Sequence, residues 1–360
     1  MEINLIIPAA GKSSRFNAGK PKWLRTHPDG KLMIEHAVDA FDSKNIKINT
    51  FIITTRDLNN EHNISDILNH TSIENFKLIL LDKKTKSAVE TIYSGIKSIG
   101  KKFNYDNFTI LKDCDNYVKS ELENKYFKSN FTIGCDLNEI NTSRVSNKSF
   151  LIINEFNLVT DFIEKKIVSD KISVGTHGFT DFSLYMNEAK KLLEKIEDKE
   201  LFNSHIIASL IYKGKKFNFI KAKFYIDFGT QKEWNNIFKN HSTYFVDFDG
   251  TLVKNKGKYG SNNWSNLNDD PLTENINVLR SFKEKGATII ITTSRSAKYS
   301  NYIKEFLKKN GLNVNHVLCD LNHSPRVIIN DFANTNPFPS CSAISFPRNS
   351  SLISYFQYDF

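Results

Sequence analysis

The feature that most constrains this chain of 360 residues is an alternation of short apolar runs with longer amphipathic stretches. The first runs are INLIIPAA, INTFIITT, FKLILL and FTILKDCD, at residues 3–10, 48–55, 76–81 and 108–115. Strands that alternate with helices at this spacing indicate a mainly parallel sheet covered by helices. Ligands of such sheets bind at the carboxyl ends of strands, so the polar residues that follow Ala10, Lys112 and Ile226 are candidates for a site.

A second series of the same kind begins at YFVDFDGTL, residues 244–252. It continues with helical patterns at residues 274–286 and 297–311 and apolar runs at residues 287–293, 313–319 and 326–331. The length suits two domains, and the two halves show no internal repeat. We therefore predict two Rossmann-like α/β domains, residues 1–241 and 242–360, the second with a smaller parallel sheet.

Composition narrows the class of protein. Hydrophobic residues make up 40% of the chain and charged residues 25%, which is typical of a globular protein and excludes a disordered one. The net charge of +9 suits either nucleic acid or an anionic small substrate. Because the lysines are scattered and form no basic arm or aromatic-interleaved patch, we expect no nucleic-acid partner.

The cysteines and the apolar runs indicate in which compartment of the cell the protein is expected. The four cysteines are far apart and form no CxxC pair, so they indicate neither a zinc site nor a disulfide framework. The first residues, MEINLIIP, are typical of a buried first strand rather than a signal peptide. No apolar run reaches the ~18 residues of a membrane span, so we expect a cytoplasmic protein without membrane insertion. The pattern leaves the oligomeric state open.

The segment IIPAAGKSSRFNAGKPKWL, residues 6–24, combines a strand, a small-residue turn and cations. Gly11 permits a tight turn whose backbone N–H groups can surround an anion. Arg15 offers a planar fork for phosphate oxygens, and Lys20 and Lys22 offer mobile point charges. The combination fits a nucleoside triphosphate, although an ordinary Gly-Ser loop with solvated cations contains the same residue types.

The order of this segment resembles the signature loop of the sugar-phosphate nucleotidyltransferases, which have a GT-A-like fold with a mixed sheet. The resemblance implies that the triphosphate is wrapped by Ala10, Gly11, Lys12, Ser13 and Ser14. It also implies that Arg15 steadies the departing pyrophosphate and that Lys22 meets the transferred and acceptor phosphates. Ser13 departs from the family pattern, which usually has a second glycine at that place.

Further landmarks follow in the family's order. TKSAVETI, residues 85–92, resembles the segment that contacts the nucleotide base through Ser87 and Ala88. In ILKDCDNYV, Asp113 and Asp115 end a strand, and carboxylates there suit Mg²⁺ that bridges phosphates. The resemblance favours Asp115 as a metal ligand and implies Asp227, in FYIDFGTQKEW, as the second. A solvated Asp pair that caps a turn is the alternative.

The acceptor side is implied by VTDFIEKKIVSDKISVGTHGF, residues 159–179, which resembles the family's acceptor-binding segment. The matching residues are Glu164, Lys165 and Gly175, whereas a single histidine such as His177 is more often structural. In the reaction, an acceptor phosphate attacks the α-phosphorus, so cations and Mg²⁺ must neutralise the approach and the leaving pyrophosphate. Positioning and electrostatics carry the rate without a protein nucleophile.

In the second half, FVDFDGTL resembles the nucleophile motif of the haloacid dehalogenase (HAD) phosphatases. The resemblance implies that Asp247 attacks phosphorus to give an aspartyl-phosphate, that Asp249 is the general acid and base, and that Gly250 lets the chain turn. Both aspartates would also hold Mg²⁺. An Asp-rich turn without function is the alternative. The chain between Leu252 and Ala287 is too short for a large cap domain.

Other HAD motifs are expected on later strands. Thr293, at the end of ATIIITT, would hydrogen-bond the phosphoryl group. RVIIND is expected to form a strand that places Asp331 in the magnesium site. For the basic third motif, Arg326 is the candidate, and Arg295 or Lys298 is an alternative.

We therefore predict a bifunctional enzyme: a nucleotidyltransferase that acts on a phosphorylated sugar or polyol, fused to a HAD phosphatase. GKSSRF resembles the cytidylyltransferases that activate small phosphorylated alcohols, which favours CTP over UTP or dTTP. Residues 330–352 resemble HAD proteins linked to bacterial capsule synthesis, which implies surface-polysaccharide precursor synthesis. A glycosyltransferase is disfavoured because a nucleoside-diphosphate donor needs no pyrophosphate-binding loop. A phosphatase with a non-catalytic nucleotide-binding or scaffold domain is the remaining alternative.

Overall fold

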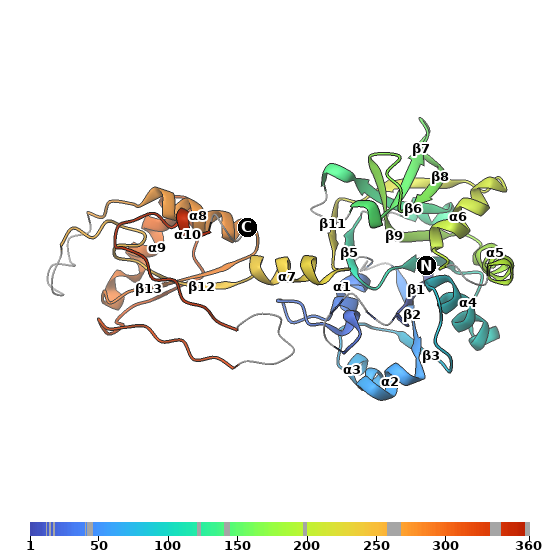
Figure 1. The fold of residues 1–360 in the computed structure, drawn as a ribbon, viewed down its shortest axis with the longest axis horizontal. Coiled ribbons are helices and arrows are strands. Elements are labelled where there is room, and N and C mark those ends of the chain that lie inside the picture. Colours follow the sequence, from blue (N-terminus) through green and yellow to red (C-terminus); the bar gives the residue numbers. More distant parts are fainter. Residues whose placement is uncertain are drawn as a thin grey trace. The chain divides into compact units, whose positions relative to one another are not determined.

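The computed structural model describes residues 1–356 except 12, 14, 15, 17, 18, 40, 42–45, 121–123, 140–144, 197–199, 258–267 and 332–339 (Figure 1). The described residues fall into two compact units, Met1–Trp234 and Asn235–Phe360. The division lies within helix α7 (Gln231–Asn240). The predicted boundary near residue 242 follows the end of the same helix, and the assignment of a separate activity to each domain stays a prediction.

The described residues of the first unit contain a nine-stranded sheet with the order β3-β2-β1-β4-β9-β6-β10-β8-β7. Its strands are β1 (Glu2–Pro8), β2 (Lys47–Thr55), β3 (Phe76–Leu81), β4 (Phe108–Lys112), β6 (Phe131–Asp136), β7 (Ser149–Ile153), β8 (Leu158–Glu164), β9 (Lys171–Phe179) and β10 (Phe217–Lys221). Strands β1 to β4 are parallel, whereas β9 runs antiparallel to both β4 and β6. The mixed α/β sheet expected from the family resemblance is confirmed, whereas the mainly parallel arrangement expected from the alternation holds only for β1 to β4 and for the pair of β6 with β10.

Helices cover both faces of this sheet. They are α1 (Met33–Asp39), α2 (Arg56–His62), α3 (Ile64–Asn69), α4 (Ala88–Ile99), α5 (Phe182–Lys195) and α6 (Asn203–Tyr212). Because successive side chains of a strand point to opposite faces, Leu5 of β1 packs in one core with Ile34 of α1, whereas Ile6 packs in the other with Ile92 of α4.

A separate antiparallel pair stands beside the carboxyl end of β4. β5 (Asn116–Lys119) pairs with β11 (Phe224–Asp227), and the register sets Asn116 opposite Asp227. The backbone N–H of Phe228 donates to the carbonyl of Asp115 over 2.9 Å. This pairing brings two segments together that lie far apart in the sequence.

The described residues of the second unit contain a three-stranded parallel sheet of β12 (Thr243–Asp247), β13 (Thr288–Thr292) and β14 (His316–Leu318). The helices α8 (Thr273–Glu284), α9 (Ser300–Lys309) and α10 (Ile353–Phe356) accompany it. Leu279 and Ile303 pack with Ile289 and Ile291 of β13 in one core. The small parallel sheet agrees with the predicted pattern, and its membership of the HAD fold stays a prediction.

The expected strand over RVIIND is wrong for this structure. Residues 325–331 have neither helix nor strand, and Val327 and Ile329 are 80% and 93% exposed. A β-branched run favours a strand only where a neighbouring strand accepts its backbone hydrogen bonds, and none of the described strands pairs with it.

None of the helices in the described part of the chain combines the length and apolarity needed to cross a membrane.

Candidate active site

Lys22 is fixed at the carboxyl end of β1 by the residue that follows it. Trp23 is 1% exposed, and its Nε1 donates to the carbonyl of Ala9 over 3.0 Å. The Oγ1 of Thr54 on β2 donates to the same carbonyl over 3.1 Å. A short 3-10 turn, η1 (Lys22–Leu24), therefore starts from a rigid point of the sheet.

The loop before η1 departs from the sequence expectation at one position. Ser13, not Gly11, has a left-handed backbone, with φ of 52°, a conformation that favours glycine. The hydroxyl of Ser13 accepts a hydrogen bond from the N–H of Lys22 over 2.7 Å. Ser13 thus occupies the backbone conformation suited to the family's glycine and also connects the loop to Lys22.

Of the remaining residues predicted to wrap the triphosphate, the structure describes Ala10 and Gly11. Ala10 is partly exposed and Gly11 is exposed, both directly after β1. A Cβ added to Gly11 would meet none of the described atoms within 4 Å, so packing does not require a glycine there. Lys12, Ser14 and Arg15 lie outside the described residues, and their roles stay predictions.

Two partly buried carboxylates converge beside Gly229. A Cβ built on Gly229 would lie 2.8 Å from Oδ1 of Asp227 and 3.1 Å from Oδ2 of Asp115. The N–H of Gly229 also donates to Oδ1 of Asp227 over 2.7 Å. The β5 and β11 pairing thus brings together the two residues predicted as metal ligands, with a glycine as the necessary small neighbour.

Lysines neutralise these carboxylates. The Nζ of Lys22 is ion-paired with Asp115, and the Nζ of Lys148 is ion-paired with Asp227. Lys112 is 1% exposed, and its Nζ donates to the carbonyls of Asp113 and Asn116 over 2.9 and 3.1 Å. Sequence reasoning missed the last two lysines. The lone charge in the apolar strand FTILK could have indicated Lys112, whereas no local signal marks Lys148.

Burial and proximity perturb the ionisation of the carboxyl groups. Burial and the neighbouring Asp115 raise the pKa of Asp113 to about 7. Burial also opposes ionisation of Asp115, but Lys22 in contact and Lys148 nearby lower its pKa to about 2. Burial raises the pKa of Asp227. Perturbed groups of this kind cluster at functional sites.

A cavity of about 550 Å³ opens above these groups. Its walls include six of the predicted site residues: Ala88, Asp115, Glu164, Lys165, Gly175 and Asp227. A volume of this order suits a small ligand rather than a macromolecule. The structure therefore gathers predicted nucleotide, metal and acceptor residues around one cavity.

The acceptor-side residues are held in different ways. The Oε2 of Glu164 accepts from the hydroxyls of Ser149 and Ser204 over 2.5 and 2.7 Å. Lys165 has φ of 57°, and its Nζ lies 4.1 Å from the centre of the Phe202 ring. Their positions in the wall suit contact with an acceptor, which stays a prediction.

Gly175 has a packing role that the sequence did not reveal. Its φ is +66°, and a Cβ built on it would overlap the carboxylate of Asp113. The N–H of Asp113 donates to the carbonyl of Gly175 over 2.9 Å. Glycine is therefore required here for both conformation and space.

On the predicted base-binding side, Ser87 is the N-cap of α4. Its hydroxyl accepts from the N–H of Glu90 over 3.1 Å and is thereby committed to the helix. Ala88 is the first residue of α4 and lines the cavity. Base contact by either residue stays a prediction.

His177 lines the cavity, and Arg25 is the C-cap residue of η1. Burial lowers the pKa of His177 to about 3, so this histidine is neutral, in keeping with a structural role. Arg25 is 6% exposed, and its Nε and Nη2 have no hydrogen-bond partner among the described residues. Sequence reasoning missed Arg25, whose buried guanidinium follows η1 directly.

The donor atoms of this site suit Mg²⁺. Asp115 and Asp227 supply hard oxygen donors, and their present lysine partners show that positive charge is stabilised at both carboxylates. Asp115 and Asp227 would therefore hold a divalent cation, which would supply positive charge to bound phosphates.

A second group of predicted residues lies at the carboxyl ends of β12 and β13. Burial and Asp249 raise the pKa of Asp247 to about 6. The Oγ1 of Thr293 donates to Oδ2 of Asp249 over 3.3 Å. Arg295, 1% exposed, forms forked ion pairs with Asp249 at 2.6 Å and Asp269 at 2.7 Å. Arg295 therefore positions Asp249, in addition to being an alternative for the third motif.

The other two candidates for the phosphatase site, Arg326 and Asp331, are exposed. The Nη1 of Arg326 donates to the carbonyls of Asn322 and Ser324 over 2.7 and 2.6 Å. Arg326 and Arg348 both act electrostatically on Asp247 and oppose the rise in its pKa. Asp331 is exposed on the irregular segment 325–331, so its role as a metal ligand stays a prediction.

Comparison with known proteins gives a family match for part of the chain. Residues 3–113 match the family model described as IspD, 2-C-methyl-D-erythritol 4-phosphate cytidylyltransferase. Comparison with curated proteins gives no match. These residues include the predicted triphosphate loop, Lys22 and Asp113.

Two solved structures are similar to the chain. The nucleoside-diphosphate-sugar pyrophosphorylase from Vibrio cholerae RC9 has 20% identity and a TM-score of 0.55, over 65% of this chain and 98% of that protein. The inositol-1-phosphate CTP transferase from T. maritima has 12% identity and a TM-score of 0.49, over 66% of this chain and 96% of that protein. The first likeness shows a shared fold. Residues 3–113 are thus similar to the IspD cytidylyltransferases, within a chain that shares the fold of a nucleotide-sugar pyrophosphorylase.

Proposed function

We propose that the first unit transfers a nucleotidyl group from a nucleoside triphosphate to a phosphorylated sugar or polyol and releases pyrophosphate. The observation that carries the proposal is the convergence of Asp115, Asp227 and Lys148 on one cavity, with Lys22 ion-paired to Asp115. The match of residues 3–113 to a cytidylyltransferase family supports it and favours CTP. UTP or dTTP is the alternative donor.

The chain's own residues account for the chemistry. An oxygen of the acceptor phosphate bonds to the α-phosphorus as the bond to the β-phosphate oxygen breaks, and pyrophosphate leaves. Lys22 and Lys148 stand beside the carboxylates with charges that can stabilise the phosphate oxygens. When bound by Asp115 and Asp227, Mg²⁺ would supply further positive charge to the phosphates. Glu164 and Lys165 would orient the acceptor.

The experiment measures pyrophosphate release with each of the four nucleoside triphosphates against a panel of phosphorylated sugars and polyols, with and without Mg²⁺. The wild type is expected to release pyrophosphate with CTP and one acceptor. The Asp227→Asn variant is expected to release none. Absence of release across the panel would refute the proposal. Transfer from a nucleoside-diphosphate sugar instead would favour a glycosyltransferase.

The second proposed activity is hydrolysis of a phosphate monoester by the second unit, which would make the enzyme bifunctional. It is favoured by Asp247 at the carboxyl end of a parallel strand, where Asp249 helps to raise its pKa, and by Asp249, which is positioned by Arg295. A carboxylate oxygen of Asp247 would bond to phosphorus as the alcohol leaves with a proton from Asp249, and water would then release phosphate. Mg²⁺ at Asp247, Asp249 and Asp331 would reduce the repulsion between carboxylate and phosphate.

Phosphate release is measured with the same acceptor panel and with the nucleotidyl products. Asp247→Asn should abolish phosphate release and leave nucleotidyl transfer intact, because the two sites use different residues. Loss of both activities in a folded variant would contradict independent sites. A cytoplasmic role in capsule or surface-polysaccharide precursor synthesis is proposed with this pair of activities. Phosphate release alone would favour the alternative of a non-catalytic first unit.

A further inference from the structure

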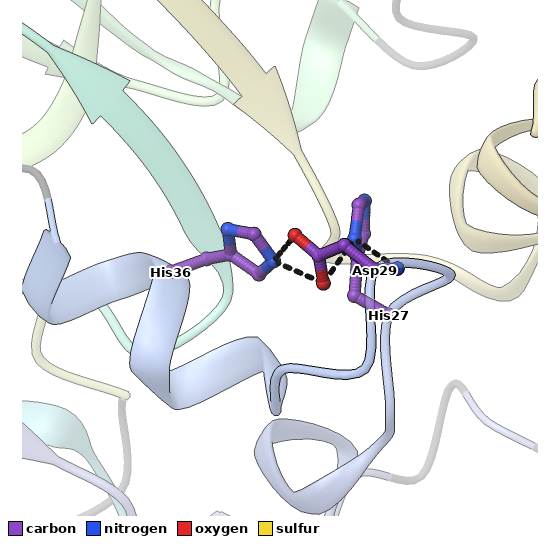
Figure 2. A group of neighbouring side chains, drawn as sticks. All are labelled: His27, Asp29 and His36. Atoms are coloured by element: carbon purple, nitrogen blue, oxygen red, sulfur yellow. Dashed lines mark hydrogen bonds and ion pairs between the residues drawn. The ribbon is translucent and has the colours of Figure 1, made fainter. Parts of the chain in front are cut away.

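A second set of potential metal ligands lies outside the cavity. His27 and Asp29 stand on the turn enclosed by the bridge between Thr26 and Leu32, and His36 stands on α1. Figure 2 shows the carboxylate of Asp29 between the two imidazole rings. Among the described residues, this is the only group of three His, Cys, Asp or Glu side chains whose ligand atoms all lie within 4.8 Å of one another.

The distances suit a shared cation. The Nδ1 of His27 lies 2.9 Å from Oδ1 of Asp29, and the Nε2 of His36 lies 3.3 Å from the same oxygen. Ligand atoms of a tetrahedral zinc ion with bonds of ~2.0–2.1 Å lie ~3.3 Å apart. The two measured separations are close to this value, so small side-chain adjustments would admit a metal ion.

The local hydrogen bonds also favour a cation between the groups. The N–H of Asp29 lies 3.4 Å from Nδ1 of His27, on the side where this nitrogen faces the carboxylate. The N–H of Lys31 donates to Oδ1 of Asp29 over 3.0 Å and so orients the carboxylate. An imidazole nitrogen and a carboxylate oxygen at contact distance require a proton or a metal ion between them. Backbone orientation of a ligand is typical of metal sites.

Aromatic side chains hold both imidazole rings. The ring centre of Phe228 lies 5.9 Å from those of His27 and His36, and that of Tyr117 lies 6.0 Å from that of His36. The imidazoles are 9% and 12% exposed, whereas the Asp29 side chain is 45% exposed. The histidines are therefore fixed, and the carboxylate side leaves room for a further ligand such as water.

We propose that His27, Asp29 and His36 bind a first-row transition metal ion, with Zn²⁺ as the best match to two imidazoles and one carboxylate. Nitrogen ligands distinguish this site from the oxygen-only carboxylates that suit Mg²⁺. The ion has a structural role: it joins the turn to α1 next to Phe228, which directly follows Asp227.

The test uses the untagged full-length protein, stripped with a chelator and dialysed against Zn²⁺ with excess Mg²⁺ to saturate the oxygen sites. About one bound zinc per chain is expected for the wild type. His36→Ala and Asp29→Asn should each weaken zinc affinity at least 10-fold, a scale set by losses at supporting residues. His70→Ala removes an exposed histidine at the C-cap of α3 and is the matched control.

Two results would overturn the proposal: a wild-type protein that retains no zinc, or zinc affinity unchanged in both ligand variants. A second measurement covers variants that fail to fold. In ¹⁵N-histidine spectra of the wild type, Zn²⁺ should change the ring signals of two of the nine histidines. Spectra in which no histidine responds would show that zinc binds elsewhere or not at all.

Discussion

The ammonium group of Lys148 donates a hydrogen bond to Oδ2 of Asp227, and it lies 3.2 Å from the hydroxyl of Tyr225. Lys148 precedes β7, and Asp227 ends β11, so the pair joins two segments that lie 79 positions apart in the sequence. Both groups face the cavity with Glu164 and Lys165. The contact makes Lys148 the strongest new candidate for a catalytic residue.

Lys148→Met should lower kcat/KM for nucleotidyl transfer about 100-fold, because one preorganised charge near the phosphates is lost. Lys148→Arg should retain part of the activity. The measurement is pyrophosphate release at saturating Mg²⁺. Lys190→Met, which changes an exposed lysine on α5, serves as the control and should match the wild type. Full activity in Lys148→Met would remove this lysine from the mechanism.

Gly229→Ala should weaken Mg²⁺ activation, because its Cβ would lie 2.8 Å from Oδ1 of Asp227 and 3.1 Å from Oδ2 of Asp115 and push the carboxylates apart. The Mg²⁺ concentration for half-maximal rate is expected to rise about 10-fold. Gly19→Ala is the control, since a Cβ there meets none of the described atoms within 4 Å. Equal Mg²⁺ dependence in both variants would contradict convergence at Gly229.

Asp113 should make stability depend on pH. Its folded pKa of about 7 lies above its ordinary value of 3.8, so its favourable contribution is present below pH 3.8 and is lost as pH rises through 7. Each unit between the two pKa values corresponds to about 1.4 kcal/mol.

The free energy of unfolding of Asp113→Asn, minus that of the wild type, should therefore increase as the pH rises from 4 to 7. Denaturant unfolding across this range measures the difference. A difference that is constant with pH would mean that Asp113 titrates normally in the fold.

Arg295→Met should destabilise the second unit by about 3 kcal/mol or more, because it leaves the buried Asp269 and the partner Asp249 without their shared cation. Denaturant unfolding followed by circular dichroism measures the change. Arg280→Met, at an exposed arginine on α8, should cost less than about 1 kcal/mol. A similar cost for both variants would show that the forked pairs add little.

Local patterns were sufficient for the first four strands of the sheet. INTFIITT and FKLILL became β2 and β3, and FTILK became β4, because apolar runs of this length suit strands of a helix-covered sheet; β4 is buried along its whole length, whereas β3 lies at the edge of the sheet. The metal candidates Asp115 and Asp227 were named from a family resemblance. Their convergence depends on the register of β5 with β11, which no local pattern specifies.

Other features depend on contacts that periodicity does not encode. The ion pair of Lys148 with Asp227 and the buried position of Arg295 arise only from tertiary packing. Residues 326–330 show that a local pattern can also predict an element that does not form. Their β-branched pattern predicts a strand, yet without a pairing neighbour they remain irregular.

Gly175 limits which positions around the cavity can be substituted. Any side chain at this position would overlap the Asp113 carboxylate, and the backbone there is left-handed. Under the proposed function, substitutions that alter acceptor preference are therefore excluded at residue 175 and expected at Glu164 and Lys165, which line the same cavity. Related enzymes with this geometry would exchange acceptors by changes at those two positions while position 175 stays invariant.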